Sequence, residues 1–112
     1  MSNDLNKVID DTIKLKNNLR FLSKNINLII EKIYDCLKNK NKLHVCGNGG
    51  SAADAQHLAA EFLVRLTSDV NRESIPALSL AQDTSTLTAC GNDYSFEDIF
   101  LRPFQAFAKR II

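Results

Sequence analysis

Apolar residues recur with the spacing of a helix over the first third of the chain. Between residues 25 and 39 they are Ile26, Ile29, Ile30, Ile33 and Leu37. This spacing predicts an amphipathic helix with one packed face and one solvated face. A looser stripe precedes it, formed by Leu5, Val8, Ile9, Ile13, Leu19 and Leu22. It predicts an earlier helix, which would pack on the helix over residues 25–39 or on another subunit.

Two short apolar runs follow, separated by a segment with helical spacing. "LHVC", residues 43–46, and "IPALSL", residues 75–80, each have the length of a buried strand. The helix expected between them has about four turns, which is enough for a right-handed crossover between parallel strands. We therefore expect an α/β fold with a parallel sheet. Residues 1–40 would form an N-terminal helical segment of the same domain, and residues 41–112 the sheet-containing part.

The remaining residues predict shorter helices. "QDTSTLTACGND", residues 82–93, looks like a loop and a short helix, and Ser95 with Asp98 gives the next segment a capping-box pattern. Pro103 is expected to kink or divide that last helix. Two strands alone do not make a stable parallel sheet. Since "AKRII" ends the sequence where another strand could begin, we expect further chain or a partner to supply the rest of the sheet.

Composition and charge narrow the class of protein. The 112 residues fit one domain, and a hydrophobic content of 45% allows a modest core. Lys and Arg total 14 against 13 for Asp and Glu, so the basic surplus typical of nucleic-acid binding is missing. No apolar run has the length of a membrane span or a signal peptide. The three widely spaced cysteines, Cys36, Cys46 and Cys90, suit reduced thiols. We expect a cytoplasmic protein without nucleic-acid or membrane partners.

A glycine-rich turn, "GNGGS", connects the first expected strand to the helix that follows. Gly47, Gly49 and Gly50 permit positive backbone dihedrals and leave room for a ligand, while Ser51 is a favourable helix N-cap. Successive amides at a helix start can bind an anion. The glycine spacing matches neither the Walker A motif nor the dinucleotide fingerprint. The turn therefore either binds an anion or only joins strand and helix.

Polar residues after the turn favour a site. Asp54, His57, Glu61 and Arg65 fall on one face of the expected helix, while Leu58, Phe62 and Leu66 would pack with the alanines. His57 and Glu61, four residues apart, can share a divalent metal, or Glu61 can act as a general base. A solvated charged face is the alternative. His44, in the strand before the turn, is expected to be a core or strand-edge residue.

"CGNGGSAADAQHLAAEF" together with "GNDYSFEDIF" resembles the sugar isomerase (SIS) domain of phosphoheptose isomerases. These enzymes interconvert sedoheptulose 7-phosphate and D-glycero-D-manno-heptose 7-phosphate. The resemblance covers essentially the whole chain. It implies a flavodoxin-like parallel sheet flanked by helices and a homotetramer with sites at subunit interfaces. It also implies the first step of ADP-heptose or GDP-heptose synthesis for lipopolysaccharide or another surface polysaccharide.

The resemblance also implies roles for single residues. Glu61 would be the acid/base that moves the proton between C1 and C2, and His57 and Glu61 would be two ligands of one zinc ion per subunit. The residues implied to contact substrate are Asn48, Gly49, Gly50, Ser51, Glu61, Arg65, Asn92 and Asp93. In the family, a Ser/Thr-rich phosphate loop and a late Gln and His complete the site, beyond the part that this sequence matches.

A non-catalytic SIS module is the alternative function. Relatives in the superfamily bind a replication initiator protein or sense phosphosugars. In the scaffold relatives the glycine turn is altered and the glutamate is replaced, whereas "GNGGS" and Glu61 are both intact here. This favours the isomerase. A truncated copy that no longer folds alone is a third possibility.

Overall fold

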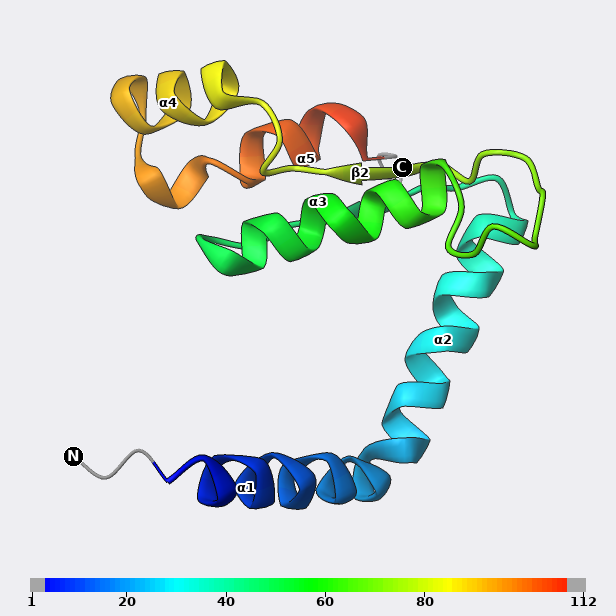
Figure 1. Cartoon of the computed structure of the whole chain (residues 1–112). Coiled ribbons are helices and arrows are strands. Elements are labelled where there is room, and N and C mark those ends of the chain that lie inside the picture. Colours follow the sequence, from blue (N-terminus) through cyan, green and yellow to red (C-terminus); the bar gives the residue numbers. More distant parts are fainter. Residues whose placement is uncertain (1–3, 109–112) are drawn as a thin grey trace. The chain divides into compact units, whose positions relative to one another are not determined.

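The computed structural model describes residues 4–108, and the chain divides into two compact units, Met1–Asp35 and Cys36–Ile112. Figure 1 shows the order of the elements: helices come first, and both strands belong to the second unit. Over the described residues, no helix combines the length and the apolar character that crossing a membrane requires.

The first unit is helical, as the spacing of its apolar residues predicts. α1 (Leu5–Asn18) begins after Asp4, whose Oδ1 accepts a hydrogen bond from the Asn6 amide at 3.0 Å. A 3-10 turn, η1 (Leu19–Leu22), leads into α2 (Ser23–Lys38). The apolar stripe of α1 is exposed in the single chain, at 69% for Leu5, 59% for Val8, 46% for Ile9 and 54% for Ile13.

α2 ends in a polar turn. Lys40 has a left-handed φ of 58°, and its amide donates to the Leu37 carbonyl at 3.0 Å. The Asn41 amide donates to the Cys36 carbonyl, also at 3.0 Å. These bonds satisfy carbonyl groups that the helix itself leaves without partners. The turn therefore stops α2 and leads the chain into the first strand.

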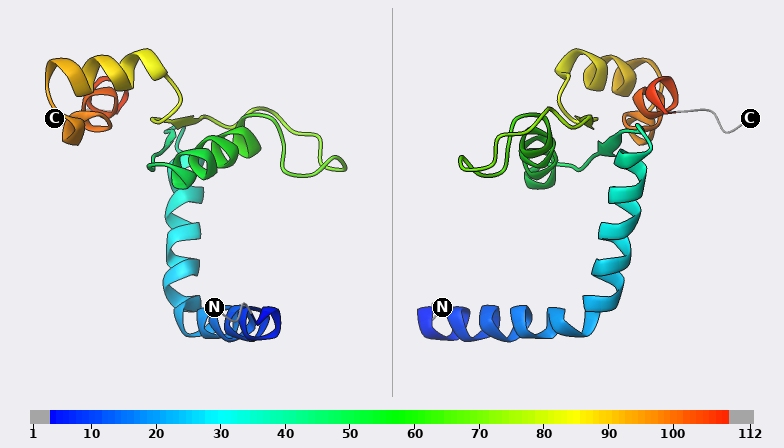
Figure 2. Two further views of the ribbon diagram at one scale, coloured as in Figure 1. Left: turned by 60° about the vertical axis from the view of Figure 1, so that its left-hand side comes forward. Right: turned by 90° about the vertical axis from the view of Figure 1, so that its right-hand side faces the viewer.

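The second unit contains the predicted parallel strands and the crossover helix. β1 (Leu43–Val45) and β2 (Ala77–Ser79) pair in parallel, joined by α3 (Gly50–Leu63). The register pairs Leu43 with Ala77, His44 with Leu78 and Val45 with Ser79. α3 contacts both strands and lies along them (Figure 2), with Ala55 and Ala59 buried. These small side chains let the helix approach the sheet closely.

Shorter helices complete this unit. α4 (Thr84–Asp93) begins after Asp83, whose Oδ1 accepts the Ser85 amide at 3.1 Å. The 3-10 turn η2 (Phe96–Asp98) and α5 (Leu101–Phe107) follow. The remaining buried residues of the core are Ala77, Ser79, Leu80, Ala81, Cys90 and Ile99. Most of the core thus gathers around the carboxyl end of β2, where α4 begins, at the same edge of the parallel sheet as the glycine turn that follows β1.

The predicted N-cap of α3 is wrong. Gly49 is the N-cap, with a φ of 57°, and the helix begins at Gly50. Ser51 lies in the first turn instead, where its amide donates to the Asn48 carbonyl at 3.0 Å. The reason is backbone geometry: the positive φ that starts the helix favours glycine, so the cap falls earlier than the serine.

The predicted extent of α3 is also wrong at its C-terminal end. The helix ends at Leu63, so Arg65 and Leu66 lie in the following loop. Leu66 is 75% exposed and does not extend the packing face. The chain turns back toward β2 at this point, and the Ile75 amide donates to the Phe62 carbonyl at 3.1 Å. The length of α3 is therefore set by the point at which the chain turns back toward β2, and not by the spacing of its apolar residues.

The last helical segment is divided, but between η2 and α5 and not at Pro103 as predicted. Pro103 lies in the first turn of α5, where a missing N–H removes no helical hydrogen bond. The capping box differs from the prediction, because the Ser95 hydroxyl donates to Asp98 Oδ2 at 2.8 Å and its side chain does not cap the backbone. The strand start expected in "AKRII" falls largely on residues 109–112, outside the described residues.

Candidate functional site

The glycine turn lies between β1 and α3, and two of its glycines are required for different local reasons. A Cβ on Gly47 would stand 2.6 Å from both Cβ and the carbonyl oxygen of Ser51. Gly49 has the positive φ of the N-cap. A Cβ on Gly49 or Gly50 would meet no atom of the described residues within 4 Å. The space in front of the first turn of α3 is therefore open to a ligand, although the amides of Ser51 and Ala52 already donate to the carbonyls of Asn48 and Gly49.

A cavity of about 500 Å³ adjoins this turn. Its walls come from the turn, the end of β2, α4, η2 and the residues after it, and its lining is Gly47, Asn48, Gly49, Ala52, Ala81, Leu87, Thr88, Gly91, Phe96, Ile99 and Phe100. Small-molecule sites generally occupy about 300–1,000 Å³. The cavity is mostly apolar with a backbone-rich end at a helix start, which suits a small ligand carrying an anionic group.

His57 and Glu61 face one another on α3. His57 Nε2 lies 2.9 Å from Glu61 Oε1, and the two side chains are 79% and 24% exposed, respectively. Glu61 Oε2 is buried and accepts no hydrogen bond from any residue between 4 and 108. A solvated surface pair would leave both carboxylate oxygens in water. Leaving a carboxylate oxygen buried without a donor is costly, so this oxygen is available to a metal or a substrate group.

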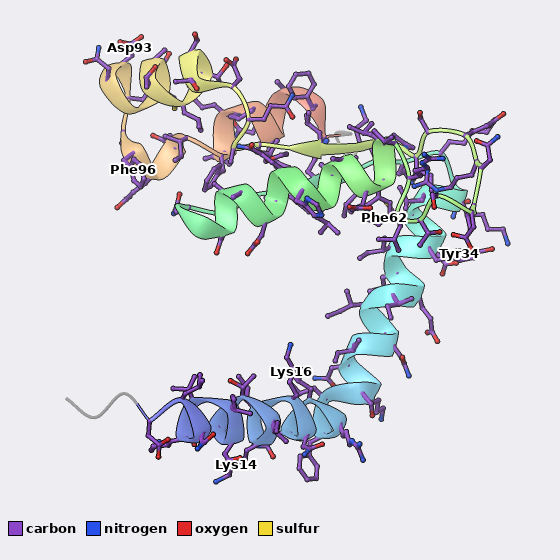
Figure 3. The ribbon with its side chains drawn as sticks, viewed as in Figure 1. Lys14, Lys16, Tyr34, Phe62, Asp93 and Phe96 are labelled. Atoms are coloured by element: carbon purple, nitrogen blue, oxygen red, sulfur yellow. The ribbon has the colours of Figure 1, made fainter. Side chains whose placement is uncertain are left out.

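The other predicted contact residues lie elsewhere. Arg65 is in the exposed loop after α3 and its Nη1 donates to the Ser68 carbonyl at 3.3 Å. Asn92 and Asp93 are at the C-terminal end of α4, where Asn92 Nδ2 donates to Asp93 Oδ1 at 2.9 Å. Figure 3 shows Asp93 at this helix end, with Phe96 in the turn below it. The single chain therefore does not gather the predicted set around one cavity.

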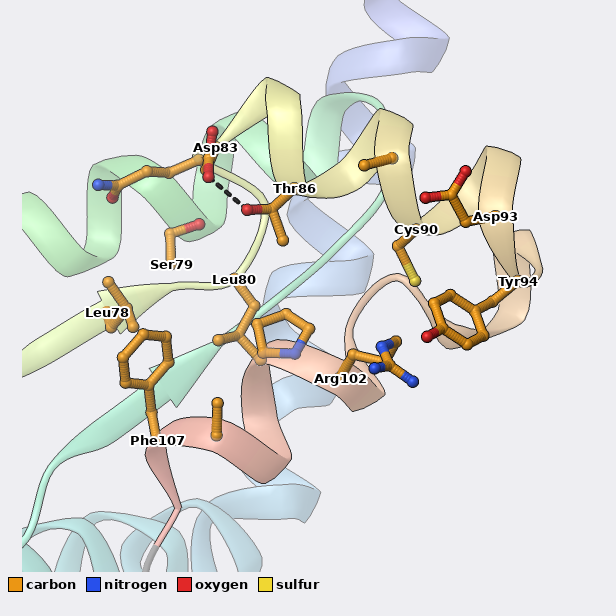
Figure 4. Close-up of a pocket in the computed structure, with 14 residues that line it drawn as sticks. Leu78, Ser79, Leu80, Asp83, Thr86, Cys90, Asp93, Tyr94, Arg102 and Phe107 are labelled. Carbon is orange, nitrogen blue, oxygen red and sulfur yellow. Dashed lines mark hydrogen bonds between the residues drawn. The ribbon is translucent and has the colours of Figure 1, made fainter.

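Asp93 lines a second cavity, of about 530 Å³, between β2, α4 and α5 (Figure 4). Its apolar wall includes Leu78, Leu80 and Phe107, and the Arg102 guanidinium lies over the Tyr94 ring, 3.9 Å from its centroid. The two cavities lie along different sides of α4. Asn48 and Gly49 line the first, Asp93 lines the second, and neither lining includes His57, Glu61 or Arg65.

Residues 10–110 match the family model described as the SIS domain. The chain belongs to the SIS-domain family. It is 52% identical over 88 residues to the phosphoheptose isomerase of Geotalea daltonii, covering 79% of this chain and 45% of that protein. It is 44% identical over 102 residues to the phosphoheptose isomerase of Leptospira biflexa, covering 90% of this chain and 52% of that protein. The chain spans about half the length of the curated relatives it matches.

Solved structures give the same assignment for this SIS domain. Phosphoheptose isomerase from Neisseria gonorrhoeae matches with a TM-score of 0.83 and 37% identity, over 94% of this chain and 53% of that one. The phosphoheptose isomerase from Francisella tularensis matches with a TM-score of 0.87 and 30% identity, over 96% of this chain and 56% of that one. These likenesses confirm the predicted family and the α/β fold. They also agree with the expectation that this sequence corresponds to only part of each relative.

The described part of this SIS domain offers two of the donors that a metal would need. No group of three His, Cys, Asp or Glu side chains suited to a metal occurs among residues 4–108. His57 and Glu61 fit as a partial set, since one oxygen of Glu61 is buried and has no hydrogen-bond partner in the described part of the chain. Protein zinc sites use three or four ligands. Any further ligands must come from outside the described residues or from another subunit.

His44 is a packed strand residue of this SIS domain. Its ring meets Phe104 edge-on, with centroids 5.6 Å apart. Burial, with a smaller contribution from the Lys42 ammonium, lowers the pKa of His44. Its position before the turn therefore reflects packing of β1 against α5.

Sequence reasoning missed Arg72, in the loop between α3 and β2. Its Nη2 donates to the Glu61 carbonyl at 2.6 Å, so it contacts the backbone of the predicted acid/base. The only signal in the sequence was an arginine between the end of a helix and the next strand. Its hydrogen-bond partners, the carbonyls of Glu61 and Phe62, are eleven and ten residues away, and no fixed spacing predicts such contacts. The two cavities were missed for the same reason, because their walls come from separate elements.

Proposed function

We propose that the protein is a phosphoheptose isomerase that interconverts sedoheptulose 7-phosphate and D-glycero-D-manno-heptose 7-phosphate. The observation that carries the proposal is the placement of Glu61 on the helix after the glycine turn: His57 contacts one carboxylate oxygen, and the other is buried with no hydrogen-bond partner among residues 4–108. Identity of about half to proteins named phosphoheptose isomerase supports the substrate class. The reaction would begin nucleotide-activated heptose synthesis for lipopolysaccharide or another surface polysaccharide.

The chemistry requires groups of the kinds that these residues supply. Exchange of an aldose and a ketose through an enediol removes a proton from one carbon and returns it to its neighbour, while a hydroxyl proton moves between the oxygens. Glu61 carries the carbon-bound proton between C1 and C2. The turn at Asn48, Gly49, Gly50 and Ser51 binds substrate, with Ser51 contributing its hydroxyl because its amide donates to the Asn48 carbonyl. Arg65, Asn92 and Asp93 line the sugar site when the complete site is assembled.

Zinc is proposed as the cofactor, held in part by His57 and Glu61. When bound, it would stabilise the negative charge that develops on the enediolate oxygen. His57 would contribute a ring nitrogen as a ligand beside Glu61, in place of the 2.9 Å contact that its Nε2 makes with Glu61 Oε1. One ion per subunit is expected, with its other ligands supplied from outside the described residues.

Assembly as a cytoplasmic homotetramer with sites at subunit interfaces is part of the proposal. Two observations support it: the apolar stripe of α1 is exposed in the single chain, and the predicted contact residues do not surround one cavity. A second subunit would cover the stripe and bring the missing walls to the site.

Glu61→Gln tests the proposed chemistry. The substitution keeps the shape of the side chain but removes the proton acceptor, so turnover of sedoheptulose 7-phosphate should fall by about two to four orders of magnitude. The assay uses the full-length product of the gene, with and without added zinc, and compares melting temperatures to show that the fold is retained. Glu73→Gln, in the exposed loop before β2, is the matched control and should keep the wild-type rate.

Two outcomes would contradict this proposal in different ways. An active wild type whose Glu61→Gln variant keeps its rate removes Glu61 from the mechanism. A wild type that stays inactive with every divalent metal favours the alternative, a non-catalytic SIS module that binds a phosphosugar or a replication initiator protein.

A further inference from the structure

Arg72 makes three hydrogen bonds to backbone carbonyl groups, two at the end of α3 and one in the loop before β2. Its Nη2 donates to the Glu61 carbonyl at 2.6 Å, and its Nη1 donates to the carbonyls of Phe62 at 2.8 Å and Glu73 at 2.9 Å. The side chain is half-buried. An arginine has five N–H donors in a planar fork, and three are directed at the main chain here. The guanidinium is therefore occupied by the chain itself.

The bonds to Glu61 and Phe62 are made to carbonyl groups in the last turn of α3. The last four carbonyls of an α-helix have no partner within the helix. In α3 the Ala60 carbonyl accepts a hydrogen bond from the Val64 amide at 2.8 Å. The Phe62 carbonyl accepts hydrogen bonds from both the Ile75 amide and Arg72 Nη1. No left-handed glycine ends this helix, because the residue after it is Val64, with a φ of −103°. The Arg72 cation also opposes the negative end of the helix dipole.

The Glu61 side chain depends on this turn of the helix for its position. Its partner His57 belongs to the same helix and is 79% exposed, and its buried Oε2 accepts no bond from residues 4–108. The carboxylate is thus placed by the backbone of α3. That backbone is tied to the loop before β2 through the bond from Arg72 to the Glu61 carbonyl.

We propose that Arg72 is a positioning residue for Glu61, holding the last turn of α3 so that the carboxylate stays in place for proton transfer. The inference rests on the proposed isomerase function. Displacement of a reacting group by about 1 Å can reduce a rate by about 100-fold. A lysine cannot replace the arginine, because its single ammonium does not reproduce the planar fork that reaches adjacent carbonyls.

The test is a mutant cycle in the full-length gene product, combining Arg72→Lys with Glu61→Gln. Arg72→Lys alone should lower kcat by about 10- to 100-fold with little change in KM, because substrate binding by the glycine turn is untouched. In the Glu61→Gln background the same substitution should have no further effect on kcat. Asn71→Ala, at the exposed neighbouring position, is the control and should keep the wild-type rate.

Amide hydrogen exchange supplies a readout that does not depend on activity. In Arg72→Lys the amides of Phe62, Leu63 and Val64 should exchange faster than in the wild type, while those at the start of α3 keep their rates. Faster exchange with the expected kcat loss supports the inference.

The outcomes separate this inference from the proposed function. If the wild type is active and Arg72→Lys keeps its kcat, or lowers kcat equally in the Glu61→Gln background, the positioning role is wrong and the isomerase remains. If the wild type turns over no sedoheptulose 7-phosphate, both proposals are overturned together.

Discussion

Replacing Gly47 with alanine should destabilise the protein through one added methyl group. The new Cβ would stand 2.6 Å from the Ser51 Cβ, 2.6 Å from its carbonyl oxygen and 2.7 Å from its carbonyl carbon. Favourable contacts between carbon atoms lie at about 3.5–4.0 Å, so the two carbon atoms are roughly 1 Å too close, and the oxygen is also well inside contact distance. Two of them are backbone atoms in the first turn of α3 and cannot move without disturbing the helix.

The expected size of the effect follows from two opposing contributions. Overpacking of this kind costs about 1–3 kcal/mol and occasionally more, and contact with rigid backbone places Gly47→Ala toward the upper end. Alanine also restricts the unfolded chain, which offsets about 0.4–1 kcal/mol. We expect Gly47→Ala to lower the free energy of unfolding by about 2 kcal/mol.

Gly91→Ala is the matched control because it adds the same methyl group without a clash. Gly91 lies inside α4, and a Cβ there would meet no described atom within 4 Å. Alanine is preferred over glycine in a helix interior by about 0.8–1.0 kcal/mol, so this variant should be more stable than the wild type. The two substitutions should therefore differ by about 3 kcal/mol.

Urea unfolding followed by far-ultraviolet circular dichroism measures both free energies by linear extrapolation. A Gly47→Ala variant within about 0.5 kcal/mol of the wild type would refute the reasoning, because it would mean that the turn relaxes freely around the new methyl group. Equal losses for Gly47→Ala and Gly91→Ala would refute it as well, since only the first position is crowded.

Two further predictions concern pH and assembly. Burial and, to a smaller extent, Lys42 lower the pKa of His44 in the folded state, so the unfolded chain takes up a proton more readily. Stability should therefore be fully present above the ordinary histidine pKa of about 6.5 and decline as the pH falls below it. Urea midpoints at neutral and mildly acidic pH should show this decline, and His44→Gln should reduce it; an unchanged slope in the variant contradicts the assignment. The exposed stripe on α1 should hold subunits together, so Ile9→Asp should dissociate the assembly in light scattering, and a wild type that is monomeric at micromolar concentration contradicts the interface.

Several features of this protein follow from short-range pattern. The period of the apolar residues predicts α2 and the two strands, because burial of one helix face or one short run leaves a local signature. The "GNGGS" turn predicts the junction between β1 and α3, since only glycine accepts its backbone geometry and its close approach to Ser51. The motifs carried by residues 46–62 and 91–100 were specific enough to indicate the SIS family, which the match over residues 10–110 confirms.

Other features required the tertiary structure because they depend on residues far apart in the chain. The spacing places Glu61 on the polar face of α3, yet its Oε2 is buried, and burial is the sum of contacts from many elements. The same spacing carries α3 through Arg65, whereas the return of the chain to β2 ends it at Leu63. Arg72 follows no motif, and only the folded loop brings its guanidinium to the carbonyls of Glu61 and Phe62. Local pattern therefore determined which elements form, while long-range contacts determined where the helix stops and how its carboxylate is held.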